Sequence, residues 1–380
     1  MASPAERGFS TPSEGPGVGC STAPASAEEA AELFQAVTDR TVAIRGAGTK
    51  QDWGGRLEPP GLTVDTRALT GVVEHAAGDL IVVVRAGTPM AELQQQLAAK
   101  GQQLALDEPV EGATVGGTVA ANISGPRRML YGTARDLVIG MTIVRADGKV
   151  AQSGGKVVKN VAGYDLGKLF TGSYGTLGLI TQLAFRLHPL PESGAVVRSR
   201  VADFAAVLAG IRGAQVVPSA VEVDSASGEI AVLVEGTAAG VRARAATLAK
   251  ILGGDAGRPD WWGRYPWEPG GTGIKVTAAL SRVPGLLSGR VKLRGSAGTG
   301  VLYAGLSADT PPEEVARCVD ELRTAARDAG GHAIVLTAPD EVRERVDLWG
   351  PVDGLALMWR VKQQFDPAAR LASGRFVGGI

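Results

Sequence analysis

Two glycine-containing turns in the first half of the chain have the residue types needed to bind a phosphate. Residues 45–50 read Arg-Gly-Ala-Gly-Thr-Lys directly after a strand-like run, and residues 114–117 read Thr-Val-Gly-Gly. Successive backbone N–H groups in such turns can converge on a phosphate oxygen, and a threonine hydroxyl adds another donor. Together the two turns would hold a pyrophosphate from two sides. Each turn taken alone is equally well explained as an ordinary tight turn.

Neither turn matches the common nucleotide-binding loops. A Rossmann loop would need a third glycine at position 51 and a helix opening there, but the chain has Gln51 followed by Asp52 and Trp53. A Walker A loop would need the pattern G-x-x-x-x-G-K-[ST], which no window of the sequence fits. NAD bound through a Rossmann loop and ATP bound through a P-loop are therefore both disfavoured.

The chain has only three histidines as candidates for a catalytic base. His75 falls in a predicted turn at 73–78, and His188 ends a strand just before a proline, where packing explains it best. His332 begins a predicted strand in the second half of the chain and is the best candidate. A structural role for His332 is the alternative. Neither a His-x-His pair nor a His/carboxylate cluster with ligand spacing occurs, so we predict no metal site.

Basic residues near the C-terminus could bind a carboxylate substrate. Arg360, Lys362 and Arg375 are the candidates, although Arg360 and Lys362 also fit the solvated side of an amphipathic helix. The two cysteines, Cys20 and Cys318, are far apart and predict unpaired thiols in a reducing compartment. Two thiols are too few to ligate an iron–sulfur cluster, which typically needs about four.

The overall composition of the chain limits the classes of partner that it can bind. Lys+Arg and Asp+Glu both number 39, so the formal net charge is zero and nucleic acid is disfavoured as a partner. No apolar run approaches the roughly 20 residues of a transmembrane helix. Residues 1–25 are rich in Ser, Pro, Gly and Ala without an apolar core, which predicts a disordered tail rather than a secretion signal. These features predict a cytoplasmic protein.

The pattern of predicted elements divides the chain near Pro189 and Pro191. Before the prolines, short strands alternate with glycine-rich stretches, and 112–132 leaves little room for regular structure. After them, strands and helices alternate in a way that predicts an α+β domain with helices on one face of a largely antiparallel sheet. The predicted helices are 27–40, 88–100, 204–211, 238–252, 284–289 and 312–328, and the main predicted strands are 41–45, 137–145, 179–187, 196–201, 230–235, 274–279 and 301–306.

Four blocks of sequence, in order, resemble the FAD-binding domain of the vanillyl-alcohol oxidase and p-cresol methylhydroxylase flavoprotein family. They are IRGAGTKQDWGG (44–55), EGATVGGTVAANISGPRRMLYGTARDLVIGMTIVRADG (111–148), GGKVVKNVAGYDLGKLFTGSYGTLGLIT (154–181) and FDPAARLASGR (365–375). The resemblance implies an α+β fold with a two-subdomain FAD-binding domain of this type. The implied division is a tail at 1–25, the FAD-binding domain at 26–190, an α+β cap domain at 191–353 and a C-terminal return segment at 354–380.

The resemblance also implies which residues contact FAD. The first turn would wrap the pyrophosphate, the second block would follow the pyrophosphate, ribityl chain and flavin ring, and the third would lie on the flavin–adenine side. The residues so assigned are Arg45, Gly46, Ala47, Gly48, Thr49 and Lys50; Thr114, Val115, Gly116, Gly117, Ala121, Gly125, Tyr131, Gly132 and Asp136; and Gly175, Thr176, Gly178 and Ile180. Some relatives attach FAD covalently through a histidine of the first loop or a cysteine of the second. Residues 49–52 are Thr-Lys-Gln-Asp and neither cysteine is near a loop, so we expect non-covalent FAD.

Within the family, the blocks KQDWGG and KNVAGYDLGKLFTGSYGTLG resemble the FAD-binding subunits of bacterial glycolate oxidases. The resemblance implies a subunit of a 2-hydroxy-acid dehydrogenase complex. It would work beside a second flavoprotein subunit and an iron–sulfur subunit, with peripheral contact to the membrane through the complex. Two alternatives stay open: a self-sufficient FAD oxidoreductase acting on lactate, glycolate or an alditol, and a non-catalytic scaffold with a vestigial flavin site.

Overall fold

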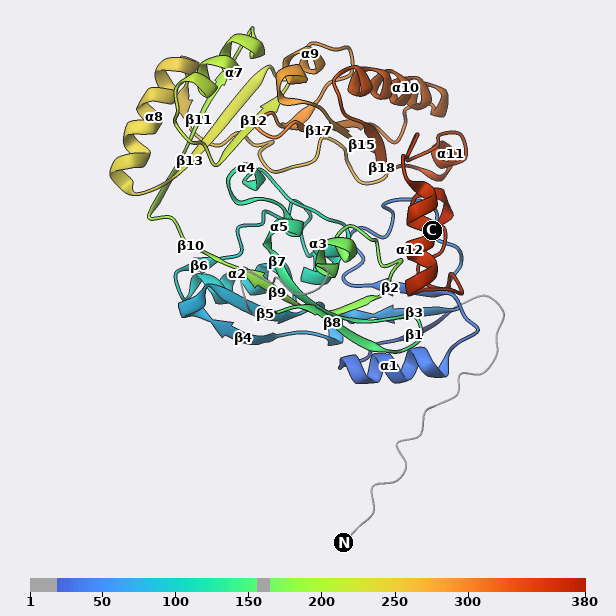
Figure 1. Ribbon diagram of the computed structural model, residues 1–380. Helices are drawn as coiled ribbons and strands as arrows, with labels where there is room; N and C mark the ends of the chain where they lie inside the picture. Colours follow the sequence, from blue (N-terminus) through green and yellow to red (C-terminus); the bar gives the residue numbers. More distant parts are fainter. Residues whose placement is uncertain (1–18, 156–164) are drawn as a thin grey trace.

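The computed structural model describes residues 19–155 and 165–380, which form two parts joined by a short connection (Figure 1). The first part contains a three-stranded and a five-stranded sheet, and the second is built on one eight-stranded sheet. Helices cover the outer face of the eight-stranded sheet, and its other face is turned toward the first part (Figure 1). The predicted α+β class is confirmed.

The three-stranded sheet positions the first glycine turn. Its order is β1-β3-β2, all parallel, from strands Cys20–Thr22, Leu62–Asp65 and Val42–Arg45. Helix α1 (Ala27–Ala36) packs beside it, and the Ser26 side chain caps its N-terminus. The predicted disordered tail is too long at its C-terminal end, because residues 20–22 form β1 through backbone pairing with β3. Residues 1–18 lie outside the described part of the chain.

The five-stranded sheet is antiparallel and forms the core of the first part. Its order is β4-β5-β9-β7-β8, with strands Val72–Ala76, Ile81–Arg85, Leu179–Arg186, Val138–Val144 and Val150–Gly154. Helices and a short two-stranded ladder pack around it. They are α2 (Met90–Ala98), α5 (Ala134–Leu137), α6 (Leu166–Phe170), β6 (Gln102–Gln103) and β10 (His188–Pro189). The predicted turn at 73–78 is wrong, because His75 lies on β4 and its Nε2 is 2.8 Å from Gln102 Oε1.

The glycine-rich stretch 112–132 contains more regular structure than its composition predicts. Helix α3 (Val115–Ala120) and the single turn α4 (Arg128–Tyr131) both lie within it. Glycine is a poor helix former, but here tertiary contacts decide. Gly116 permits a close approach, because an added Cβ would lie 2.7 Å from the Cβ of Ala86. The backbone of α3 can therefore pack directly against the end of β5.

The eight-stranded sheet of the second part has the order β14-β11-β13-β12-β16-β17-β15-β18 and is antiparallel throughout. In that order its strands are Asp255–Ala256, Ser193–Arg200, Glu229–Gly236, Ala220–Asp224, Arg294–Ser296, Val301–Leu306, Thr272–Thr277 and Ala333–Thr337. Its covering helices are α7 (Phe204–Gly213), α8 (Ala238–Leu252), α9 (Val283–Leu287) and α10 (Pro312–Asp328). On β12, Val221 and Val223 enter the core under these helices, so Glu222 and Asp224 point to the opposite face.

The C-terminal segment returns to the first part of the molecule. Beyond α11 (Asp340–Arg343), helix α12 (Leu355–Phe365) leads into a tail that pairs with β2, where Val42 N–H donates to Arg370 O at 2.7 Å. The proposed solvated face of α12 is wrong for Lys362, which is only 1% exposed. Its ammonium donates to Thr176 O, Asp366 Oδ2 and Leu371 O at 2.8, 2.7 and 2.9 Å.

Candidate functional site

The first glycine turn leaves strand β2 with a row of unengaged backbone donors. Gly48 has φ +79°, which reverses the chain directly after the strand. Within the described part of the chain, the backbone N–H groups of residues 47–50 donate to no protein acceptor. Successive unengaged N–H groups around a positive-φ glycine can bind an anion. The turn therefore has the donors that a phosphate needs.

The two glycine turns are in direct contact. A Cβ added to Gly46 would lie 2.4 Å from Thr114 Oγ1, so the turn can approach Thr114 only because it lacks a side chain there. Thr114 is the N-cap of α3, and its hydroxyl accepts from Gly117 N–H at 3.3 Å. A ligand lying against one turn must therefore lie beside the other.

The second turn, unlike the first, has most of its backbone N–H groups engaged within the protein. Val115 N–H donates to Thr88 O at 2.9 Å, and Gly116 N–H donates to Ala86 O at 2.7 Å. With the Gly117 N–H donating to Thr114, the first backbone donors of α3 are occupied within the protein. The N–H groups of residues 115–117 are therefore not free phosphate donors, contrary to the hypothesis from the sequence. This turn offers a side-chain-free backbone surface instead.

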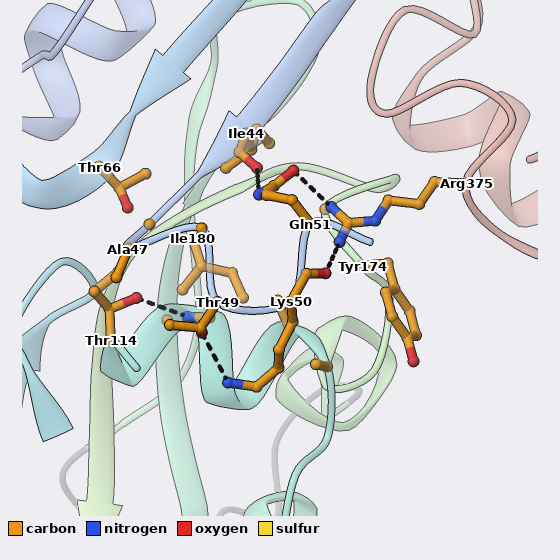
Figure 2. Close-up of a pocket in the computed structure, with 18 of the residues that line it drawn as sticks. Ile44, Ala47, Thr49, Lys50, Gln51, Thr66, Thr114, Tyr174, Ile180 and Arg375 are labelled. Atoms are coloured by element: carbon orange, nitrogen blue, oxygen red, sulfur yellow. Dashed lines mark hydrogen bonds between the residues drawn. The ribbon is translucent and has the colours of Figure 1, made fainter. Parts of the chain in front are cut away.

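The turns border one cavity of about 660 Å³, which we call the glycine-lined cavity. Figure 2 shows its labelled side chains arranged around the open space between the β2 turn and α3. The sequence-assigned residues that line it are Gly46, Ala47, Gly48, Thr49, Lys50, Thr114, Gly116, Gly117, Ala121, Gly175, Gly178 and Ile180. The three blocks of sequence thus converge on one site.

Seven assigned residues lie elsewhere. Arg45 pairs with Asp65 at 3.4 Å beside the turn, and Val115 is buried in the core. Thr176 donates its hydroxyl to Ser173 O at 2.7 Å, under the cavity wall. Gly125 lines a separate cavity, and the Tyr131 hydroxyl donates to Glu235 of the second part. Gly132 ends α4, and Asp136 belongs to the capping box of α5. None of these seven lines the glycine-lined cavity.

Arg375 fixes the first turn from behind, a role that the sequence did not reveal. Its guanidinium donates to Gln51 Oε1 at 3.5 Å and to Lys50 O (Figure 2). It also donates to Trp53 O at 3.2 Å. Burial lowers the pKa of the Arg375 guanidinium, opposed by the nearby Tyr174 hydroxyl. Burial also raises the pKa of Tyr174 to about 12, so this hydroxyl stays neutral. Both residues line the glycine-lined cavity, and Arg375 is placed for positioning the turn.

A buried charge pair lies at the wall of the same cavity. Lys50 is 6% exposed, and its Nζ lies 3.3 Å from Glu108 Oε2. Burial lowers the pKa of the Lys50 ammonium, while the Glu108 carboxylate opposes that change. Glu108 is held in turn by the Thr118 hydroxyl of α3. The pair links the β2 turn to α3 and places a positive group beside the unengaged donors.

The histidines do not meet at this cavity. His332 is exposed just before β18, whose far end at Thr337 bonds Asp52 of the first part. It is therefore about five residues, or roughly 16 Å along a strand, from the joint between the parts. His188 packs edge-on against Tyr131 at 4.9 Å. The structure gives His332 no position for acid–base chemistry at the glycine-lined cavity.

The part of the chain that contains both glycine turns matches a known protein family. This family is described as an FAD binding domain, and it matches residues 20–154. No histidine or cysteine is among the described residues that line the cavity. No helix of the described chain is long and apolar enough to cross a bilayer, and no cluster of three or more His, Cys, Asp or Glu suited to a metal occurs in that part either.

Curated relatives match about half of the chain. Glycolate oxidase subunit GlcE of Escherichia coli is 38% identical over 173 residues, which cover 45% of this chain and 49% of the relative. Glycolate oxidase subunit GlcD of Bacillus subtilis is 31% identical, covering 53% of this chain and 44% of its own length. A D-lactate dehydrogenase of Archaeoglobus fulgidus is 33% identical over 44% of this chain and 38% of its own. The matches span about half or less of these relatives.

The fold itself extends over nearly the whole chain in a solved structure. An alkyldihydroxyacetonephosphate synthase superposes with a TM-score of 0.64, covering 93% of this chain and 75% of the synthase chain. The sequences are 16% identical, so this likeness concerns the fold alone. Both parts of the molecule therefore belong to an architecture already seen in one chain.

Proposed function

We propose that this chain is an FAD-dependent oxidoreductase, that residues 20–154 form an FAD-binding domain of the vanillyl-alcohol oxidase and p-cresol methylhydroxylase type, and that the glycine-lined cavity holds FAD non-covalently. The observation that carries this proposal is the turn at 47–50, whose free N–H groups face a cavity that also contains Lys50. These donors and the ammonium suit the pyrophosphate. When bound, FAD supplies the hydride acceptor.

The chain's own residues would bind and orient this group. The turn donates backbone hydrogen bonds, and α3 presents Gly116 and Gly117 so that the ligand can lie against backbone. Arg375 holds the turn in place through its bonds to residues 50–53. Gly175 and Gly178 border the other side of the cavity. The site thus binds through fixed backbone, which costs little reorganisation on binding.

We further propose that the chain is the FAD-binding subunit of a glycolate-oxidase-type 2-hydroxy-acid dehydrogenase. Its partners would be a second flavoprotein subunit and an iron–sulfur subunit, toward which electrons pass. The similarity to GlcE and GlcD supports this assignment. The chain spans about half the length of the curated relatives it matches, so the assignment extends beyond the aligned region.

Two single substitutions of glycine, one at the site and one control, test the FAD site. Gly116→Ala would drive a methyl group to 2.7 Å from Ala86 Cβ and push α3 out of place. Overpacking of this kind costs about 1–3 kcal/mol, so we expect FAD affinity to fall roughly tenfold to a hundredfold. Gly78→Ala, where an added Cβ meets nothing within 4 Å, is the matched control. Equal FAD affinity of the two variants by flavin fluorescence titration would contradict the proposed site.

The subunit assignment is tested by glycolate reduction. We expect the visible flavin bands of the isolated FAD-loaded chain to persist with glycolate alone. They should bleach when the second flavoprotein subunit is added, and dye reduction should require both chains. Bleaching and dye turnover by the isolated chain would instead establish the self-sufficient oxidoreductase. A protein that binds no FAD would establish the scaffold alternative.

A further inference from the structure

Residues 50–55 continue the first glycine turn and lie against the second part of the molecule; we call them the anchor segment. Gly54 N–H donates to Leu336 O of β18 at 2.8 Å, across the joint between the parts. The Thr337 hydroxyl, one residue farther along β18, donates to Asp52 Oδ2 at 2.7 Å. The turn that faces the glycine-lined cavity is therefore tied to the edge strand of the eight-stranded sheet.

Arg343, at the end of α11, adds two more bonds to the same segment. Its Nη1 donates to Gly54 O and its Nη2 donates to Asp52 O. Its Nε donates to Ala338 O at 2.7 Å, which fixes the plane of the guanidinium against the second part. Because a guanidinium presents several donors in one rigid plane, it can bind two backbone carbonyls at once. Arg343 is thus placed to hold the backbone of the anchor segment.

Two arginines divide the carbonyl groups of the anchor segment between them. Arg375 of the C-terminal tail donates to Lys50 O and Trp53 O, whereas Arg343 of the second part donates to the carbonyls at positions 52 and 54. A carbonyl and the N–H group of the next residue belong to one rigid, planar peptide group. Fixing these carbonyls therefore fixes the path by which the chain leaves the turn.

Short backbone bonds connect the anchor segment to the turn that faces the cavity. Gln51 N–H donates to Gly48 O at 3.3 Å, and Trp53 N–H donates to Lys50 O at 3.2 Å. Gly48 is the positive-φ glycine of the turn, and Lys50 carries the last of its free N–H groups. Displacing the anchor segment would therefore displace these donors. None of the described residues of the eight-stranded part lines the glycine-lined cavity, so that part would act on it through the backbone.

A different region of the joint contains a bond that does not reach the turn. It surrounds a second cavity, which we call the interdomain cavity and define by Gly125 and Arg128 of the first part and by Glu222, Ser296 and Tyr303 of the second. Arg128 Nη2 donates to the Tyr303 hydroxyl there at 3.3 Å. This cavity shares no lining residue with the glycine-lined cavity. Loss of the Tyr303 hydroxyl would therefore remove a bond between the parts and leave every bond of the anchor segment in place.

We propose that Arg343 is a positioning residue for the FAD site, so that docking of the second part and binding of the FAD diphosphate are coupled. This inference rests on the proposed FAD site. With the anchor segment held by Arg343 and Thr337, the donors of the turn are fixed before the ligand arrives, which lowers the ordering cost of binding. Without these bonds, the ligand itself must order the segment. Such coupling is reciprocal, so bound FAD stabilises the joint in turn.

The experiment is titration of the full chain with FAD, followed by flavin fluorescence, and with ADP, followed by calorimetry. ADP carries the diphosphate but has no flavin ring. We expect Arg343→Ala to weaken the binding of both probes by the same factor, at least tenfold, because two charge-assisted hydrogen bonds behind the turn are lost. Tyr303→Phe is the matched control, since it also loses a bond between the parts. It should bind both probes as the unmodified chain does.

Two further measurements separate positioning from a general loss of stability. Millimolar guanidinium ion should restore much of the FAD affinity of Arg343→Ala and leave that of Tyr303→Phe unchanged; failure to restore it would overturn the positioning role. If Arg343→Ala does not fold by circular dichroism, Thr337→Val removes the bond to Asp52 at nearly constant shape. FAD affinity should then fall at least fivefold.

The inference and the FAD site fail in different ways. The inference alone is overturned if the folded Arg343 and Thr337 variants bind FAD normally, if they lose FAD affinity but keep ADP affinity, or if Tyr303→Phe weakens FAD binding equally. An unmodified chain that binds neither FAD nor ADP would overturn the proposed FAD site, and this inference with it.

Discussion

The glycine-lined cavity and the interdomain cavity are built from different parts of the chain. The first is bordered by backbone, with Gly46, Gly116 and Gly117 close to one another and few side chains intruding. The second is bordered by side chains, among them Glu222 and Ser296, which are directly opposite each other on neighbouring strands. The first therefore suits a large ligand bound by its phosphates, whereas the second belongs to the joint between the two parts.

The two cavities also differ in how their charges are balanced. In the C-terminal segment that supports the glycine-lined cavity, Lys362 has three acceptors, one of them a carboxylate. At the interdomain cavity, Arg128 has no carboxylate of the described chain within ion-pair distance, and Glu222 is kept neutral by burial. A buried cation that is paired with a carboxylate, as Lys362 is with Asp366, indicates a structural role.

The largest expected effect concerns Lys362, the buried lysine that forms an ion pair with Asp366. Lys362→Met leaves the Asp366 carboxylate, itself 1% exposed, without its cation. Removing one partner of a buried pair costs about 3–5 kcal/mol, so the free energy of unfolding should fall by that amount. Urea unfolding followed by circular dichroism measures it. Arg360→Met, exposed on the same helix, should change stability by less than about 0.5 kcal/mol. Equal effects would show that Lys362 is not structural.

The next effect tests the neutral acid of the interdomain cavity. Glu222 has a pKa of about 8 when folded, above its ordinary value of 4.5, so the folded state binds this proton more tightly than the unfolded state. Its contribution to stability is therefore fully present below about pH 4.5 and is lost as the pH rises from there to about 8. Relative to Glu222→Gln, the unmodified chain should lose roughly 2–4 kcal/mol of unfolding free energy between pH 5 and 9.

Denaturant unfolding at the two pH values checks this difference, with Glu28→Gln at the exposed start of α1 as the control. The control should follow the unmodified chain at both pH values. If Glu222→Gln also followed it, the carboxyl would be ionised throughout. The contrast between a neutral interdomain acid and the ion-paired support of the first cavity would then be lost.

This contrast explains how far the sequence predicts the molecule. Each glycine turn is a local pattern, and the ordered blocks that resemble the FAD-binding family assign 46–49 and 114–117 to one site. The strongly periodic helices were also predicted closely; α8 spans Ala238–Leu252 as expected. Local composition failed where tertiary packing decides, as in α3, whose glycines allow contact with β5 and so form a helix despite low propensity.

The interdomain cavity could not be predicted in this way. Glu222 and Ser296 are separated by a long stretch of chain and become neighbours only through the register of β12 and β16. Arg128 joins them from the other part of the molecule. Nor does sequence reveal that Arg375 turns back onto the first turn, since that depends on the path of the tail after α12. Side-chain sites assembled across strands require register, which a single sequence does not specify.

The smallest predicted effect sharpens the role of the tail at the glycine-lined cavity. Arg375→Lys keeps the positive charge but loses the planar fork that reaches Lys50 O, Gln51 and Trp53 O together. Loss of about one net hydrogen bond, about 1 kcal/mol, should weaken FAD binding roughly three- to tenfold by fluorescence titration. Arg56→Lys, at an exposed position near the same turn, should leave FAD affinity unchanged. Because Arg375 does not line the interdomain cavity, the pH dependence of unfolding that Glu222 causes should also stay unchanged. A parallel change in both properties would mean that the two cavities are coupled, since a change confined to the turn would then reach Glu222.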